Sequence, residues 1–311
     1  MRDVQDTPSL VRTCTVCGAA AGKERWRPPA SPGPVVVCSV CGFVYVNPIH
    51  DVNALILDGP VLGDYPATLL ESKDIALLAG SWEAPLIANH LRREAAKRMN
   101  ARAALAQIAA LAPDRGRLLD VGCFCGLFLD EARQAGWACT GIEPLVMPAI
   151  YARGQFGLRV VTDTLHQASF PAAYFDVVTA FQVFEHLVYP MEEIEKIRGM
   201  LKPGGLLLIE VPNIDTVLVR LLGARHRHFV SDHVSFFSAA TLSRLLNQAG
   251  FRVRKVYHPT RTLRVGAVLW WLNRYSKGLA SAARRILPQR IKETPVRLNL
   301  GDMVAVIAEK R

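Results

Sequence analysis

Residues 118–144, which read LLDVGCFCGLFLDEARQAGWACTGIEP, constrain the fold more than any other stretch of this chain. Leu118, Leu119 and Val121 predict a short apolar strand, and the glycines at 122 and 126 permit a sharp turn. Residues 127–135 follow helical spacing until Gly136 ends the helix, and residues 137–142 form a second apolar run. The sequence therefore predicts a β-α-β unit, the first half of a nucleotide-cofactor site.

An acidic residue follows the second strand of this unit. Glu143 stands where a β-α-β nucleotide fold places a carboxylate against the two hydroxyls of a ribose. The turn from Asp120 to Gly126 reads D-x-G-x-x-x-G and lacks the G-x-G-x-x-G pattern that seats a dinucleotide pyrophosphate. D-V-G-C-F-C-G followed by G-I-E-P resembles motif I and the acidic loop of class I S-adenosylmethionine-dependent methyltransferases. The resemblance implies an α/β, doubly wound Rossmann-like sheet that binds S-adenosyl-L-methionine.

The resemblance also implies which residues bind this methyl donor. Residues 160–163 and the turn after them resemble the adenine-binding loop of the family, and residues 181–182 end the next strand. The expected donor-binding residues are Asp120, Gly122, Cys123, Gly126, Glu143, Asp163, Thr164, Phe181 and Gln182. Phe124 departs from the family pattern, which has a small residue there, so its ring is expected either to crowd the donor or to line its pocket.

Further segments continue the pattern of this family. We expect strands at 174–181, 206–211, 251–257 and 303–308, and helices at 85–111, 191–201 and 238–248. Lys202-Pro203-Gly204-Gly205 is expected to break the helix at 191–201 before a buried strand, as L-K-P-G-G does in this family. The last two strands are expected to form a hairpin split by an insertion, so the resemblance covers about residues 84–261 and the final strand.

Four cysteines near the N-terminus form a second motif. Cys14, Cys17, Cys38 and Cys41 make two C-x-x-C-G pairs separated by twenty residues. Four thiolates at this spacing favour a closed, structural zinc site, and disulfides are the alternative. We expect a zinc-binding module at 1–48, a linker with a helical lead-in at 49–113, and the donor-binding domain at 114–311 with a basic helical insertion at about 262–295. Cys123, Cys125 and Cys139 are expected to be small buried residues.

The chain carries a formal net charge of +10 and half of its residues are hydrophobic. Seven cysteines, no apolar leader at the start and no long apolar span predict a cytoplasmic protein. The basic, tryptophan-containing insertion suits peripheral contact with the inner face of a membrane, and a helix covering the cleft or packing on a second subunit is the alternative. A phosphate-bearing acceptor would equally explain the charge. The basic residues at 92–102 are expected to form a solvated helix face.

Methyl transfer requires positioning of the acceptor, and a base where the acceptor must lose a proton. His186, with its neighbour Glu185, follows a strand at the carboxyl edge of the sheet, where open α/β folds bind ligands. His233 lies in a segment that resembles the one before the sixth helix of sugar C-methyltransferases with a like zinc module, although those enzymes have Glu where Asp232 stands. Tyr65 precedes the donor domain as a tyrosine does in those enzymes. These four residues, Glu185, His186, His233 and Tyr65, are the expected catalytic residues, and a structural role for each is the alternative.

The sequence thus predicts an S-adenosylmethionine-dependent methyltransferase with a structural zinc module. The expected acceptor is a small molecule or a glycan-linked group, such as a nucleotide-activated sugar, methylated on oxygen or carbon. Two alternatives stay open. One is an RNA methyltransferase, which the basic composition favours although no N-P-P-Y-like loop follows residue 181. The other is an inactive binding or assembly partner in which Phe124 fills the donor site.

Overall fold

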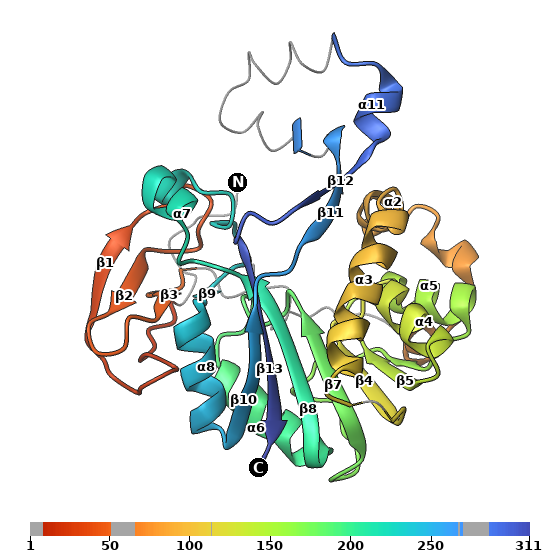
Figure 1. The fold of residues 1–311 in the computed structure, drawn as a ribbon, viewed down its shortest axis with the longest axis horizontal. Coiled ribbons are helices and arrows are strands. Elements are labelled where there is room, and N and C mark those ends of the chain that lie inside the picture. Colours follow the sequence, from red (N-terminus) through yellow and green to blue (C-terminus); the bar gives the residue numbers. More distant parts are fainter. Residues whose placement is uncertain (1–8, 51–65, 113, 267, 270–285) are drawn as a thin grey trace.

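We describe the fold from a computed structural model, in which residues 9–50, 66–112, 114–266, 268–269 and 286–311 are described. Seven strands form the central sheet in the order β10-β13-β8-β7-β4-β5-β6 (Figure 1). Their bounds are β4 Arg117–Val121, β5 Ala138–Ile142, β6 Val160–Val161, β7 Phe175–Phe181, β8 Leu201–Pro212, β10 Phe251–Tyr257 and β13 Met303–Lys310. Strands β4 to β8 run parallel, while β13 is antiparallel to both of its neighbours. The sheet is therefore the mixed, doubly wound sheet that the sequence predicted.

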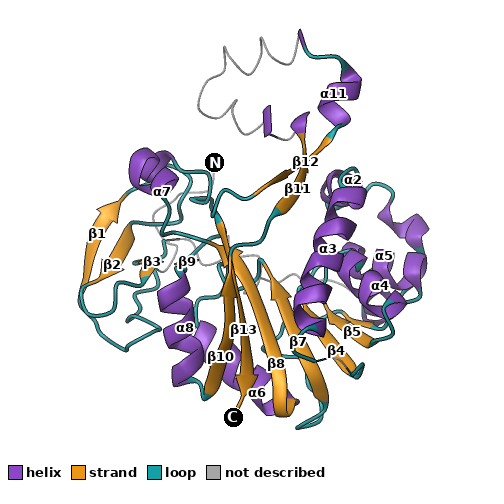
Figure 2. Ribbon diagram, viewed as in Figure 1, coloured by secondary structure: helices purple, strands orange, loops and turns teal. Residues whose placement is uncertain are grey.

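Helices cover both faces of this sheet, as Figure 2 shows. Alternate strand residues point to opposite faces, so Leu118 and Val177 join one core cluster while Leu119 and Val178 join the other. The helices whose side chains enter the first cluster are α3 Glu94–Ala109, α4 Leu127–Gln134 and α5 Val146–Phe156. Those entering the second are α6 Pro190–Met200 and α8 Ala239–Gln248. Burial on both faces explains the apolar runs in the sequence.

One local expectation was wrong. The single helix expected at 85–111 is two helices, α2 Ala84–Leu91 and α3, because the chain turns at Arg92 and Arg93. The helix expected to end before residues 202–205 does end there, at Met200, and β8 begins at Leu201 and continues through these residues with an irregular register against β7. The helix expected at 238–248 is confirmed, and the Ser238 side chain caps it by accepting a hydrogen bond from the Thr241 amide.

The N-terminal segment forms a second sheet that includes a strand from the main domain. Its order is β1-β2-β3-β9, with β1 Gly22–Trp26, β2 Val35–Cys38, β3 Val44–Val46 and β9 Ser235–Phe236. Strand β9 begins two residues after His233 and pairs with β3 through Val44 and Tyr45. The cysteine-containing segment is thus joined by backbone hydrogen bonds to the loop that carries an expected catalytic residue.

Arg12 connects the same two regions. Its buried guanidinium donates hydrogen bonds to the backbone carbonyls of Val46, Val188 and Val234. The last two of these residues follow His186 and His233 closely in sequence. Burial lowers the pKa of Arg12 to about 10, so the side chain stays charged at neutral pH. Arg12 therefore stabilises the arrangement of both histidine loops.

The hairpin expected near the C-terminus is confirmed, because β10 pairs with β13 and an insertion separates them. Within the insertion, β11 Arg261–Arg264 and β12 Pro295–Leu298 form an antiparallel ribbon that extends from the sheet to the short helix α11 Gln289–Glu293 (Figure 1). Most of the expected amphipathic helix lies outside the described residues. Across the described residues, no helix is both long and apolar enough to cross a membrane.

Five shorter elements complete the described fold. They are α1 Ala67–Leu70, the 3₁₀ helix η2 Ile75–Leu78, α7 Val217–Leu222, the 3₁₀ helix η3 Gly223–Arg225 and a turn over 184–186. Helix α7 lies beside the N-terminal sheet in Figure 1, and a Cβ added at Gly223 would contact the Trp26 ring.

Candidate functional site

A cavity of about 430 Å³ opens where the parallel strands end, the usual ligand position in open α/β sheets. Its walls come from the turns after β4, β5, β6 and β7 and from helices α2 and α3. The polar residues that line it are His90, Lys97, Asn100, Asp120, Glu143, Thr164, His166, Gln182, His186, Glu193, Glu210, Asp232 and Arg261. The cavity thus joins residues that lie far apart in the sequence.

The turn after β4 approaches the cavity with its backbone. Gly122 has φ +70°, and a Cβ there would lie 2.6 Å from Val183 Cγ2. Gly126 has φ +76° and is the N-cap of α4, with Leu158 Cδ1 2.6 Å from an added Cβ. Both positions therefore require glycine for conformation and for space. Phe124 lies between them with φ 48°, and its ring lines the cavity against His90, with centroids 4.6 Å apart.

Glu143 is held by the turn that it faces. Its Oε2 accepts a hydrogen bond of 2.7 Å from the Phe124 amide, and its Oε1 accepts one of 2.9 Å from Leu145. Burial raises the pKa of Glu143 to about 7, although these two amides oppose the rise. The carboxylate keeps further lone pairs for ligand hydroxyls, as the ribose interpretation requires.

Asp120 lies beside Glu143 in the same wall. Its Oδ1 accepts a hydrogen bond of 2.7 Å from Thr179 Oγ1. Burial raises the pKa of Asp120 to about 8, and the nearby Glu143 charge adds to the rise. Burial also keeps the pKa of the Cys123 thiol well above its ordinary value, so this cysteine is a neutral wall residue. Two acids share a buried wall here, a frequent feature of functional sites.

The structure brings most of the expected donor residues to the cavity. Residues Asp120, Gly122, Cys123, Glu143, Thr164, Phe181 and Gln182 line it. Gly126 lies just behind the wall as the cap of α4, and Asp163 does not line the cavity. Instead, an Asp163 carboxylate oxygen accepts a hydrogen bond from the Thr164 amide at 2.8 Å. Cys125 is fully buried, whereas Cys139 is only half-buried.

Three of the four expected catalytic residues form one cluster. Each of Glu185, His186 and His233 offers a carboxylate oxygen or ring nitrogen, and these atoms lie within 4.8 Å of one another. His186 lines the cavity, whereas Glu185 and His233 lie behind it. The Glu185 carbonyl accepts hydrogen bonds from the Val234 and Ser235 amides, which holds the two loops together.

Backbone carbonyls fix both imidazoles. Nδ1 of His186 lies 2.9 Å from the Asp232 carbonyl oxygen, and Nδ1 of His233 lies 2.9 Å from the His228 carbonyl oxygen. Because a carbonyl can only accept, each Nδ1 carries the proton and each Nε2 presents a lone pair. His186 Nδ1 is also 3.4 Å from Asp232 Oδ2.

Burial changes the protonation of the two residues behind His186. The pKa of Glu185 rises to about 8 through burial, and the neighbouring acids Asp232 and Glu210 add to the rise. The pKa of His233 falls to about 4 through burial and the neighbouring His186 ring. At neutral pH, Glu185 therefore holds a proton and His233 is uncharged. Oε2 of Glu185 has no hydrogen-bond partner among the described residues.

The basic residues expected on a solvated helix face have different environments. Arg92 and Arg93 are exposed, but Arg98 forms ion pairs with Asp130 and Glu131 and is mostly buried. Lys97 lines the cavity together with Arg261 from β11. The expectation was wrong for these residues because helix α3 packs on α4 and on the inserted strand β11. The fourth expected catalytic residue, Tyr65, lies outside the described residues.

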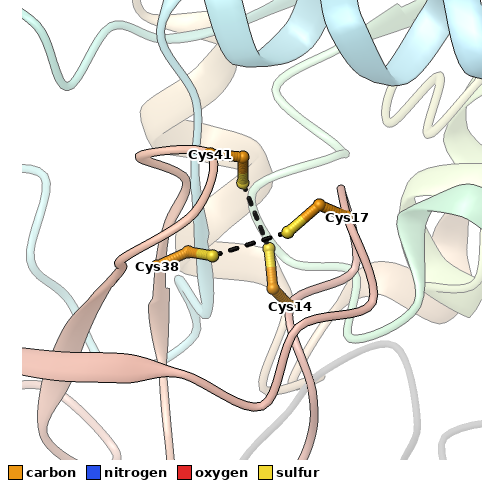
Figure 3. A group of neighbouring side chains, drawn as sticks. All are labelled: Cys14, Cys17, Cys38 and Cys41. Atoms are coloured by element: carbon orange, nitrogen blue, oxygen red, sulfur yellow. Dashed lines mark hydrogen bonds between the residues drawn. The ribbon is translucent and has the colours of Figure 1, made fainter.

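The four N-terminal cysteines converge on one point, as Figure 3 shows. Their sulfur atoms all lie within 4.8 Å of one another, at 3.4 Å for Cys14 and Cys41 and 3.5 Å for Cys17 and Cys38. Sulfurs around a tetrahedral zinc ion lie about 3.8 Å apart, whereas a disulfide bond is about 2.05 Å long. The arrangement is therefore compatible with a closed zinc site and excludes disulfides in this conformation.

Each C-x-x-C-G pair has the turn that such a site needs. The Gly18 amide donates to the Cys14 carbonyl at 2.7 Å, and the Gly42 amide donates to the Cys38 carbonyl at 3.0 Å. Gly18 has φ +73° and Gly42 has φ +74°, a backbone conformation that favours glycine. The backbone therefore orients two sulfurs of each pair toward the common centre without the help of side chains.

Comparison with known proteins matches this architecture. A family model described as a methyltransferase domain matches residues 88–256, more than half of the chain. The ubiquinone biosynthesis O-methyltransferase of Aeromonas salmonicida strain A449 is 30% identical over 152 residues, covering 44% of this chain and 63% of that protein. The tRNA U34 carboxymethyltransferase of Methylococcus capsulatus is 28% identical over 172 residues, 52% of this chain and 53% of that protein. Both matches thus span less than two thirds of the relative.

Solved structures share the fold. An S-adenosylmethionine-dependent methyltransferase from Thermotoga maritima superposes with a TM-score of 0.50 at 20% identity, covering 74% of this chain and 98% of that chain. A chain from the complex of the Haloferax volcanii Trm112 activator with a methyltransferase gives 0.52 at 17% identity, covering 73% of this chain and 95% of that chain. From the fold, the glycine turn and the family match, the chain belongs to the class I S-adenosylmethionine-dependent methyltransferases.

Proposed function

We propose that this protein transfers the methyl group of S-adenosylmethionine to a hydroxyl oxygen or an acidic carbon of a small-molecule acceptor. The observation that carries the proposal is the position of His186, which lines the same cavity as Asp120 and Glu143. The acidic wall suits the donor, and the histidine suits an acceptor that must lose a proton. A nucleotide-activated sugar is the acceptor to test first, because the zinc-module resemblance and the basic cavity residues support it.

The donor, when bound, supplies a methyl group on a positively charged sulfur. Glu143 would accept hydrogen bonds from its ribose hydroxyls, and the turn from Gly122 would leave room for its amino-acid tail. His186 Nε2 would take the acceptor proton as the new bond to the methyl group forms and the methyl–sulfur bond breaks. Nδ1 of His186 meanwhile stays on the Asp232 carbonyl, so the ring keeps its orientation.

Glu185 and His233 would act through His186 and not on the acceptor itself. Both lie behind the cavity wall, within 4.8 Å of a His186 ring nitrogen. A protonated Glu185 and an uncharged His233 add no charge beside the imidazole while it is neutral. When His186 gains a proton, neither neighbour carries a like charge that would oppose it. We therefore assign both as positioning residues.

RNA is a second candidate acceptor. A net charge of +10 favours a polyanionic partner, and the Methylococcus relative is named for tRNA. The small-molecule proposal rests on the cavity that His186 lines, and the RNA alternative rests on the overall charge of the chain. Direct labelling of the acceptor separates the two.

Zinc is part of the proposal, with Cys14, Cys17, Cys38 and Cys41 as its ligands. The metal would have a structural role, because four thiolates leave no open coordination position.

The test is transfer of labelled methyl from S-adenosylmethionine by the full-length protein into separated fractions of RNA, lipid-linked glycan and small molecules. Label in a small-molecule or glycan fraction, lost in a His186→Ala variant, is the expected result. Label confined to RNA would replace the proposed acceptor. No label in any fraction, with donor binding intact, would contradict turnover on these acceptors.

A further inference from the structure

One end of the cavity is cationic, and the donor carboxylates Asp120 and Glu143 do not explain it. Lys97 of α3 and Arg261 of β11 both line the cavity, together with Asn100. Arg261 comes from the insertion, whereas α3 precedes the donor motif, so no single sequence motif contains this group. From this arrangement we propose that Lys97 and Arg261 form a subsite for one anionic group, a carboxylate or a phosphate, of a ligand in the cavity.

Two hydrogen bonds join the strand that carries Arg261 to the helix that carries Lys97. The Thr262 amide donates to Asn100 Oδ1 at 2.8 Å, and Asn100 Nδ2 donates to the Thr262 carbonyl at 3.5 Å. These bonds join β11 to α3 next to both basic residues. The insertion thus contributes directly to the cavity wall, and its first strand is part of the site.

The charges at this end do not balance. Arg261 Nη1 pairs with Glu210 Oε1 at 2.5 Å, so one acid accounts for one of the two cations. Within the described part of the chain, no ion pair or side-chain hydrogen bond involves the Lys97 ammonium. Burial, followed by the charges of Arg261 and Arg93, lowers the pKa of Lys97 to about 8. Lys97 is therefore mostly charged at neutral pH. The nearby carboxylate that raises its pKa is that of Glu210, which already pairs with Arg261, so two cations share one carboxylate and a bound anion would balance the second charge.

This inference rests on the proposed function, in which a methyl donor and an acceptor share the cavity. Either of these two ligands could supply the anion. The donor carries a carboxylate on its amino-acid tail. Helix α2 contacts the motif I turn through His90 and Phe124, and Lys97 lines the same cavity as this turn, so the tail is one candidate for the anion. An acceptor with a carboxylate or phosphate would use the same cations from the His186 side. The experiment separates these sources.

Titration calorimetry with a Lys97→Met variant tests the subsite. This variant breaks no ion pair of the described residues and should fold. S-adenosylmethionine, decarboxylated S-adenosylmethionine and inorganic phosphate serve as probes, the last added to protein saturated with S-adenosylhomocysteine. Lys97→Arg keeps the charge, and Lys23→Met removes an exposed lysine on β1 as the matched control.

If the donor carboxylate is the anion, Lys97→Met weakens S-adenosylmethionine binding roughly 10- to 100-fold and leaves the decarboxylated donor unaffected. If the acceptor supplies it, donor binding is unchanged and phosphate binding to the saturated wild type is lost in the variant. Lys97→Arg should retain most of the affinity in either case. Unchanged binding of every probe in Lys97→Met would overturn the subsite. Failure of the wild type to bind the donor would contradict the proposed function instead, and phosphate added to the protein without S-adenosylhomocysteine would then still test Lys97.

Discussion

The imidazole rings of His186 and His233 lie edge to face, with centroids 4.8 Å apart and planes at 82°. They come from different loops, and each donates its Nδ1 proton to a backbone carbonyl. Of the two histidines, only His186 lines the cavity. We therefore assign removal of the acceptor proton to His186 and positioning of the His186 ring to His233.

Replacing the two histidines should therefore have unequal effects. His186→Ala should reduce kcat by about 10²- to 10⁴-fold, the usual contribution of a general base, without changing donor affinity. His233→Ala should cause a smaller loss, and His233→Gln, which can keep a hydrogen bond, should recover part of it. Steady-state kinetics with donor titration measures both. A larger loss in His233→Ala than in His186→Ala would reverse the assignment.

Donor affinity should depend on pH through Glu143. Its pKa of about 7 in the free protein means that it is protonated in acid, whereas ribose hydroxyls bind best to the ionised carboxylate. Affinity should thus fall as pH decreases from 8 to 6, by up to about tenfold per pH unit below the pKa.

A Glu143→Gln variant is the control for this pH dependence. It should bind the donor more weakly and lose the part of the dependence centred near pH 7. Asp120 also titrates near the site, with a pKa of about 8, and remains in the variant. Calorimetry at each pH provides the measurement, and equal slopes in variant and wild type would rule out Glu143 as the titrating group.

Phe124 should support the donor site and not obstruct it. Its amide binds Glu143, while its ring contacts His90 on α2. Phe124→Ala keeps the amide but removes the ring contact, so donor affinity should fall several-fold. His90→Ala should have a similar effect, and the double variant should be little worse than either one. Tighter donor binding by Phe124→Ala would instead show that the ring crowds the donor.

Zinc removal should affect turnover through the N-terminal sheet. Cys14→Ser should release the metal and loosen β3, which pairs with β9 next to His233. We expect kcat to fall while donor affinity stays close to that of the wild type. Cys139→Ser, which alters a half-buried cysteine outside the cluster, is the control. Metal analysis and kinetics check this, and full turnover in a zinc-free Cys14→Ser protein would contradict the coupling.

Arg12 offers a test of the same coupling without touching the metal. Arg12→Met removes the guanidinium hydrogen bonds from three backbone carbonyls, of which Val234 keeps the Val46 amide as a donor, and should lower the free energy of unfolding by about 2 kcal/mol or more. Turnover should fall more than donor binding, because two of the three affected carbonyls, those of Val188 and Val234, belong to the histidine loops. Thermal unfolding and donor titration measure the two effects, and equal losses would indicate a general structural role.

Local patterns predicted the donor half of the site. The turn from Gly122 to Gly126 and the acid at Glu143 are contiguous in sequence, and their conformation follows from glycine and strand periodicity. The cysteine pairs were predictable for the same reason. Asp163 was the exception, because its carboxylate turned toward the Thr164 amide and not toward the cavity.

The cationic end of the cavity could not be predicted from local patterns. Lys97 belongs to a charged helix face that resembles many solvated ones, and only packing of β11 on α3 encloses it. Arg12 precedes the first cysteine of the N-terminal motif and belongs to no recognisable sequence pattern. Both depend on contacts between residues more than 150 positions apart in sequence, such as Asn100 with Thr262 and Arg12 with Val188.

The most direct test of the account is calorimetric titration of the folded, zinc-loaded protein with S-adenosylmethionine, alongside Glu143→Ala. The account predicts one saturable site in the wild type and an affinity at least about tenfold weaker in the variant, the cost of a lost charge-assisted hydrogen bond. Absence of binding by the wild type, or equal affinity in both proteins, would contradict a donor site at the end of β5.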